Sequence, residues 1–235
     1  MAEDVDDKDG DRPEAAAAGE IPGPLGRIKD KLIATKEKWA REGRLLTGVP
    51  GRDRLPPGQR QVRNWPVLDL GVQPLVTTAA WRLQVDGLVE NPLDLDWAAF
   101  QALPQDTLVS DIHCVTAWSR YDNRWTGVRS AEILKRARPK PEAGFLVFTS
   151  HDGYTTNVTR EIFSDPDVLL AQAWEGEPLS REHGGPVRVI MPRYYFWKSA
   201  KWVRRIRFLA ADRPGFWEER GYHNTGDPWK EERYS

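Results

Sequence analysis

The chain has 235 residues, of which 40% are hydrophobic and 29% charged, and these values are typical of globular proteins. Its single cysteine excludes an internal disulfide and any metal site built from several cysteines. No apolar run approaches the roughly 20 residues that span a bilayer, and the acidic N-terminus is unlike a secretory or twin-arginine signal. We therefore expect a cytoplasmic protein without a transmembrane segment.

An acidic tail comes first in the chain. Residues 1–20 carry eight acidic and two basic side chains. A segment with this composition buries too little apolar surface to offset the entropic cost of ordering. We predict that residues 1–24 form a disordered tail.

The next segment, residues 25–60, is basic. Apolar residues recur near a helical spacing and predict an amphipathic helix over 25–42. Its basic face is typical of a solvated surface helix, although acidic lipid or a protein partner would also suit it. The stretch 47–60 is rich in Gly, Pro and Arg, which predicts a linker.

A folded domain is predicted over residues 61–235. Asp96, Ser130 and Asp165 each precede a short helix-like run and are predicted N-caps, with Pro166 at the first position of the third helix. Strands and helices follow one another in an irregular order, which indicates the α+β class. The aromatic C-terminal ending is expected to fold back on the domain. Strand-like runs occur at 81–85, 107–114, 145–149, 187–191 and 202–209.

Cys114 is one candidate for chemistry, since it lies at the end of a predicted strand in DIHCVTAWS. A lone cysteine is more often a small buried hydrophobic residue than a ligand. A thiolate ligand needs electropositive surroundings, and His113 and distant arginines are the only neighbours that provide them. The histidines lack the H-x-x-x-H spacing of a zinc site, and no G-x-S-x-G elbow predicts a Ser-His-Asp triad.

The run 193–207 is a second candidate, with six basic residues, five aromatic residues and no acid. Aromatic faces stack on flat ligands, and Lys or Arg binds phosphate, so this composition suits a flat anionic ligand. A non-catalytic module that binds single-stranded nucleic acid with 193–207 is the alternative. Against it, the chain is slightly acidic, with a net charge of -1, and we expect no nucleic-acid partner. An amphipathic strand pair with a basic outer face also fits.

Four separated segments together resemble the sulfite oxidase family of molybdenum enzymes, over about residues 61–210. VRNWPV at 62–67 resembles the family's Arg-Asn stretch, and DIHCVTAWS at 111–119 resembles the segment with the metal cysteine. HGGPVRVIMP at 183–192 resembles the pterin-binding strand, and KSAKWVRRI at 198–206 resembles the phosphate-binding segment. The resemblance implies a mixed-sheet molybdopterin-binding domain that holds molybdenum on a single pterin without a nucleotide.

The resemblance also implies a role for each matching residue. Cys114 would be the metal thiolate, and Arg63 would attract the substrate as a second catalytic residue. The pterin and its phosphate would be held by Arg63, Asn64, Trp65, Thr149, His183, Arg188, Ser199, Ala200 and Lys201. Arg and Lys suit an anionic cofactor, and a soft thiolate suits a transition metal.

Two departures from the family bear on the substrate. Gln172 occupies the place of the active-site Tyr of sulfite oxidases, and Trp118 and Ser119 occupy the stretch where arginines follow the metal cysteine. The expected reaction is a two-electron oxygen-atom transfer on a small sulfur or nitrogen oxide or oxyanion. No haem domain is recognisable, so we expect a separate protein to donate or accept electrons.

Overall fold

The computed structural model describes residues 30, 33–35 and 54–235. The predicted tail 1–24 and the linker residues 47–53 lie outside the described residues. Of the predicted helix 25–42, only residues 30 and 33–35 are described, and these are helical. Within the described part of the chain, no helix is both long enough and apolar enough to cross a membrane.

A six-stranded sheet is built around β5 (Trp118–Arg129). It pairs antiparallel with β4 (Gln105–Cys114) on one side and with β8 (Leu169–Trp174) on the other. The short strand β1 (Arg60–Gln61) runs parallel to the first residues of β5. The sheet is completed at β8 by β9 (Glu177–Pro178) and β10 (Arg188–Ile190).

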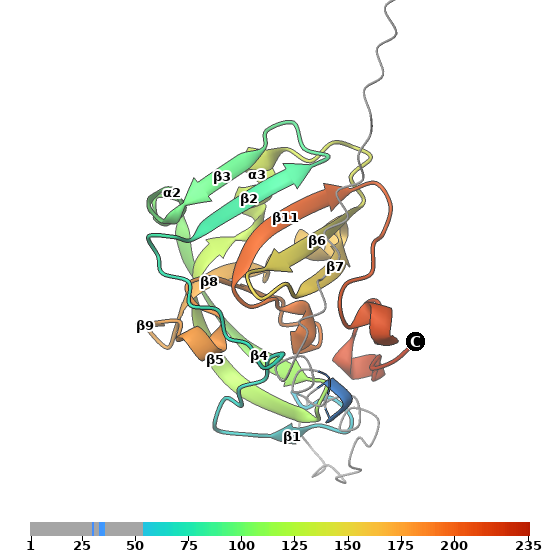
Figure 1. The fold of residues 1–235 in the computed structure, drawn as a ribbon. Helices are drawn as coiled ribbons and strands as arrows, with labels where there is room; N and C mark the ends of the chain where they lie inside the picture. Colours follow the sequence, from blue (N-terminus) through green and yellow to red (C-terminus); the bar gives the residue numbers. More distant parts are fainter. Residues whose placement is uncertain (1–29, 31–32, 36–53) are drawn as a thin grey trace, which may run out of the picture.

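A five-stranded sheet lies above β4 and β5 in the view of Figure 1. Its strand order is β3-β2-β11-β6-β7, so β11 (Val203–Leu209) is the central strand. This strand runs parallel to β2 (Arg82–Gly87) and antiparallel to β6 (Phe145–Ser150). The outer strands are β3 (Leu93–Asp96) and β7 (Thr155–Thr159). One cluster of buried hydrophobic residues spans both sheets.

Short helices join the strands: α2 (Trp97–Gln101), α3 (Ser130–Ala137) and α4 (Arg160–Phe163). The predicted cap at Asp96 is confirmed, because its side chain accepts a hydrogen bond from the Ala99 amide at 2.8 Å. The predicted cap at Ser130 is wrong by one residue. Ser130 is already helical, and Arg129 precedes it without a capping side-chain hydrogen bond. The predicted α+β class is confirmed.

The predicted helix after Asp165 is wrong, because most of the run 168–174 forms β8. This strand lies inside the sheet between β5 and β10, and Leu169, Leu170 and Ala171 are fully buried. A strand that is covered on both faces is apolar at successive positions, so it lacks the alternation that would separate it from a helix.

The C-terminal residues fold back on the domain as predicted. They contain two short 3-10 helices, η3 (Glu218–Arg220) and η4 (Pro228–Lys230). Phe216, Trp217 and Tyr222 are buried, and Tyr222 stacks edge-on against Tyr234 with ring centroids 5.0 Å apart. The end of the chain is therefore part of the structure around the site.

Candidate active site

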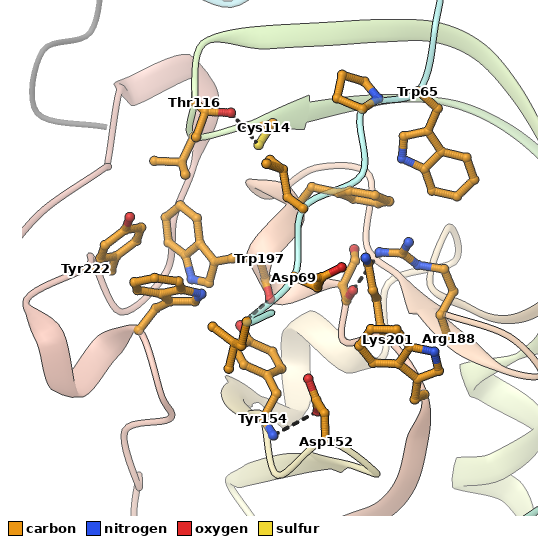
Figure 2. A pocket seen from close by; sticks show the side chains of 18 of the residues that line it. Trp65, Asp69, Cys114, Thr116, Asp152, Tyr154, Arg188, Trp197, Lys201 and Tyr222 are labelled. Carbon is orange, nitrogen blue, oxygen red and sulfur yellow. Dashed lines mark hydrogen bonds between the residues drawn. The ribbon is translucent and has the colours of Figure 1, made fainter. Parts of the chain in front are cut away.

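A cavity of about 820 Å³, which includes space open to solvent, lies beside the end of β4. Figure 2 shows that side chains from distant parts of the sequence meet in it. Its walls are strongly aromatic, and the size and lining are typical of a small-molecule or cofactor site. Five tryptophans contribute to the walls: Trp65, Trp118, Trp197, Trp202 and Trp217.

Cys114 is the last residue of β4 and lines this cavity. Cys114 is only 6% exposed, and its Sγ lies 3.1 Å from Thr116 Oγ1. The turn after it closes with a hydrogen bond from the Ala117 amide to the Cys114 carbonyl at 3.0 Å, and Ala117 has a φ of 66°. In Figure 2 the thiol lies on the opposite side of the cavity from Arg188 and Lys201.

Arg188, on β10, is a buried cation that also lines the cavity. The residue is 1% exposed, and its guanidinium donates to the carbonyls of His183 at 2.9 Å and Ser199 at 2.8 Å. Among the residues that the structure describes, no carboxylate pairs with it, and its buried Nε has no hydrogen-bond partner. Burial therefore lowers the pKa of the guanidinium to about 9. An anion in the cavity would supply the missing counter-charge.

Ser199 and Lys201 line the cavity beside Arg188 and follow the 3-10 helix η2 (Phe196–Lys198). Ser199 Oγ accepts from the Met191 amide at 2.9 Å, and Lys201 Nζ donates to the Glu182 carbonyl at 2.6 Å. Gly184 permits this close approach. Its φ is +103°, and a Cβ there would lie 2.9 Å from the Cβ of Lys201. Two cationic groups thus face one part of the cavity.

Trp65 and His183 form a stacked pair at the cavity wall, with ring centroids 3.8 Å apart. The His183 imidazole is fixed on both nitrogens: Nδ1 lies 2.9 Å from Ser180 Oγ, and Nε2 lies 3.3 Å from the Trp65 carbonyl. Burial lowers the pKa of His183, and Arg188 and Lys201 lower it further. The neutral imidazole is therefore the favoured form.

The other predicted cofactor residues do not line the cavity. Arg63 and Asn64 are exposed, and Thr149 is half-buried on β6 opposite Arg205 and Thr155. Ala200 is buried but contributes backbone hydrogen bonds rather than cavity surface. The structure thus brings together Cys114, Trp65, Arg188, Ser199 and Lys201, with His183 behind Trp65.

Several cavity residues were missed by sequence reasoning. Asp69 and Asp152 contribute carboxylates, and Tyr222 contributes a ring from beyond the last sheet strand. The aromatic C-terminal ending was the only sequence signal for Tyr222 and Trp217, since no local spacing connects them to Cys114.

A buried ion pair supports the cavity wall from outside. Lys198 Nζ lies 2.6 Å from Glu218 Oε1, and both side chains are almost completely buried. The same carboxylate oxygen accepts from Trp197 Nε1 at 2.9 Å, while the Tyr154 hydroxyl donates to the Trp197 carbonyl at 2.6 Å. Trp197 is therefore held on its side chain and its backbone.

The nucleic-acid alternative gains no support from the geometry of 193–207. Stacking on bases requires exposed rings, but Tyr195, Trp197 and Trp202 are buried. Of the basic residues on β11, Arg205 is paired with Asp86 at 2.6 Å. The aromatic groups of this run serve mainly the interior of the domain, while Arg193, Arg204 and Arg207 are exposed.

The cavity fits a flat anionic cofactor that carries a metal. It combines stacking surfaces, an uncompensated buried guanidinium and a single thiol on the facing wall. Among the described residues, no group of three or more His, Cys, Asp or Glu side chains could hold a metal ion. The fold and site together define a cofactor-binding enzyme domain.

The chain belongs to the oxidoreductase molybdopterin binding domain family, whose model matches residues 70–217. The prediction of a sulfite oxidase-like molybdopterin oxidoreductase is confirmed at the level of family, fold and enzyme class. The family implies a molybdenum–pterin cofactor.

Relatives agree with this assignment. The chain is 46% identical over 183 residues to the uncharacterized oxidoreductase YuiH of Bacillus subtilis, across 77% of this chain and 92% of that protein. It is 31% identical to the protein-methionine-sulfoxide reductase catalytic subunit MsrP of Ralstonia nicotianae, across 63% of this chain and 51% of MsrP. The chain thus spans about half the length of that subunit. The solved sulfane dehydrogenase SoxCD of Paracoccus pantotrophus shares the fold, with a TM-score of 0.55 and 24% identity over 59% of this chain and 40% of that one.

Proposed function

We propose that this chain catalyses two-electron oxygen-atom transfer with a molybdenum cofactor that has a single pterin and no nucleotide. Cys114 supplies the metal thiolate, and Arg188, Ser199 and Lys201 hold the anionic end of the pterin. The observation that carries this assignment is the buried Arg188, which lacks a carboxylate partner among the described residues and faces the same cavity as Cys114. A cofactor phosphate supplies the charge that this guanidinium lacks.

The protein side of the site orients and shields the cofactor. When bound, the cofactor supplies the oxygen-atom transfer and the redox change of the metal. Trp65 and Trp202 are among the aromatic residues of the cavity wall, and Lys201 and Arg188 provide positive charge. Five predicted cofactor residues do not line the cavity, and their contributions stay predictions: Arg63, Asn64, Thr149, His183 and Ala200.

A neutral S- or N-oxide is the substrate class that this cavity favours. The lining cations Arg188 and Lys201 are assigned to the anionic end of the cofactor, and the other charged lining residues are the carboxylates Asp69 and Asp152. No lining cation is then left to bind an oxyanion substrate. Trp118 lines the cavity where sulfite oxidases place arginines. The similarity to a protein-methionine-sulfoxide reductase catalytic subunit supports the same class.

A separate protein is proposed to deliver the electrons. MsrP is named as a catalytic subunit, which agrees with a division of labour between chains.

The first experiment measures molybdenum. Protein purified from a host with intact pterin synthesis is expected to contain close to one molybdenum per chain, by elemental analysis. Cys114→Ser is expected to fold but to lose activity, because a hydroxyl is a poor ligand for a soft metal site. A Cys114→Ser enzyme with full activity would exclude this cysteine as the ligand.

The second experiment compares substrates. We expect a higher kcat/KM for a panel of sulfoxides and N-oxides, driven by a reduced dye, than for sulfite with an oxidised acceptor. Arg63→Ala tests the predicted substrate role of the exposed Arg63. If wild type oxidises sulfite efficiently and Arg63→Ala does not, the proposed reduction of S- or N-oxides is wrong and the chain is a sulfite-oxidising enzyme.

A further inference from the structure

The turn that carries Cys114 is held by two side chains from the two ends of the described chain. Gln59 Nε2 donates to the Cys114 carbonyl at 3.0 Å, and Arg233 Nη1 donates to the Val115 carbonyl at 2.6 Å. Both residues lie outside the range 70–217 that the family model matches. The Cys114–Val115 backbone is therefore held by groups outside the segment that the family model matches.

Gln59 is buried and held at both ends of its amide. It is 2% exposed, and its Oε1 accepts from Ser119 Oγ at 3.3 Å. The same hydroxyl lies 2.8 Å from Nδ1 of the buried His113. The neighbouring backbone is fixed as well, because the Arg60 amide donates to the Ala117 carbonyl at 3.1 Å. The side-chain amide of Gln59 is therefore held in place and restrains the position of the Cys114 carbonyl.

Arg233 reaches the turn from the C-terminal segment. Its side chain is 11% exposed, and its Cζ lies 5.4 Å from the centre of the buried Tyr195 ring. The His223 amide donates to the Arg233 carbonyl at 3.2 Å, which fixes the backbone behind the side chain. The Glu231 carboxylate lies 3.9 Å from Nη2 of Arg233, while Nη1 makes the hydrogen bond to the Val115 carbonyl.

The turn needs such support. Ala117 adopts the left-handed region at a φ of 66°, which costs a residue other than glycine about 1 kcal/mol. A single backbone hydrogen bond, from Ala117 to Cys114, closes the turn. A strained conformation persists only where its surroundings determine it. Because the backbone sets the direction of the Cα–Cβ bond, support of the carbonyls also fixes where the thiol points.

We propose that Gln59 and Arg233 are positioning residues that orient the Cys114 thiolate toward the metal. The inference rests on the proposed function, in which Cys114 is the metal ligand. Neither residue lines the cavity. They act through the carbonyls of Cys114 and Val115, and they couple the geometry of the metal site to segments at both ends of the domain.

The test uses the full-length, molybdenum-loaded enzyme. Gln59→Glu keeps the side-chain size but removes the amide donor, and Arg233→Met removes the guanidinium. Gln105→Glu is the control for removal of an amide donor at an exposed position, since Gln105 donates to the Phe100 and Leu103 carbonyls away from the site. Arg205→Met is the control for the second. Arg233→Lys, which retains a donor, is the rescue variant.

Two properties are measured besides activity: the rate of molybdenum loss during dialysis, and the electron paramagnetic resonance spectrum of the half-reduced metal. The loss of one hydrogen bond corresponds to roughly a two- to tenfold effect for a neutral donor such as the Gln59 amide, and to roughly a ten- to hundredfold effect for a charged donor such as Arg233. We expect molybdenum loss to be faster by these factors in Gln59→Glu and Arg233→Met. Both variants should show broadened or additional resonances. The controls should match wild type, and Arg233→Lys should recover most of the wild-type signal.

The outcomes separate this inference from the proposed function. Wild-type protein that contains no molybdenum overturns both. A second outcome overturns only the positioning role. In it, wild type contains molybdenum and Cys114→Ser does not, but Gln59→Glu and Arg233→Met keep the wild-type spectrum and rate of molybdenum loss. Lower melting temperatures with an unchanged spectrum would likewise reduce both residues to structural supports.

Discussion

Replacement of Arg188 by methionine is expected to affect the cofactor-free and the loaded protein differently. Without cofactor, burial lowers the pKa of Arg188 from its ordinary value to about 9, which corresponds to roughly 5 kcal/mol of unfavourable charge burial at neutral pH. Below pH 9 the native guanidinium is charged, so this cost is present in full. Methionine removes it, because a thioether carries no charge.

The same substitution also removes favourable contacts. The carbonyls of His183 and Ser199 lose their donors, and a buried unsatisfied group costs about 1–3 kcal/mol, so the two together cost about 2–6 kcal/mol. Gain and loss nearly cancel. We expect the free energy of unfolding of the cofactor-free Arg188→Met protein to lie between about 1 kcal/mol below and about 3 kcal/mol above that of wild type.

Cofactor binding has no such compensation. A charge-assisted hydrogen bond contributes about 1.5–3 kcal/mol, so Arg188→Met should bind the cofactor roughly ten- to a hundredfold more weakly. The assay compares urea unfolding of protein from a pterin-deficient host with the molybdenum content of protein from a competent host. Arg205→Met serves as the control, because it removes an arginine on β11 that is paired with Asp86 on β2. Wild-type molybdenum content together with a large loss of stability would refute the reasoning and make Arg188 a structural residue.

Three further perturbations are expected to have defined effects. Glu218→Gln leaves the buried Lys198 ammonium without its counter-charge and should cost about 3–5 kcal/mol in urea unfolding, while an unchanged midpoint would show that the pair is not needed. Gly127→Ala places a Cβ 2.0 Å from the Leu170 carbonyl oxygen and should lower stability by about 1–3 kcal/mol, since β5 and β8 must move apart; a wild-type melting temperature would contradict this. Deletion of residues 1–20 should leave melting temperature and activity nearly unchanged, because the acidic run has little apolar surface to bury, and a large fall in either would show that the tail docks on the domain.

The elements predicted from the sequence are those with a local signature. The alternation of Trp81, Leu83 and Val85 predicted β2, because one face of that strand is buried and the other is exposed. Asp96 predicted the start of α2, because the capping interaction spans only three residues. In both cases the residues that decide the structure are neighbours in the chain.

Neither β5 nor the side chains that support the Cys114 turn were predicted, because the residues that decide these features are far apart in the chain. The sequence of β5, WSRYDNRWTGVR, mixes charged and aromatic residues, and pairing with both β4 and β8 stabilises the strand. Gln59 and Arg233 act on carbonyl groups 55 and 118 residues away. A backbone carbonyl is present at every position, so nothing in the sequence marks which one a distant side chain will bind.

The central place of β11 in its sheet has a consequence for how the protein is made. The strand enters between β2 and β6, although it is the last strand in the chain. During synthesis, β2 and β6 therefore present unpaired edges until residue 209 has left the ribosome. Pairing of β11 with β2 joins segments about 120 residues apart, and contacts of such sequence separation form slowly. Ser199 and Lys201 directly precede this strand, so the cavity that they line with Cys114 is complete only after this segment has been synthesised.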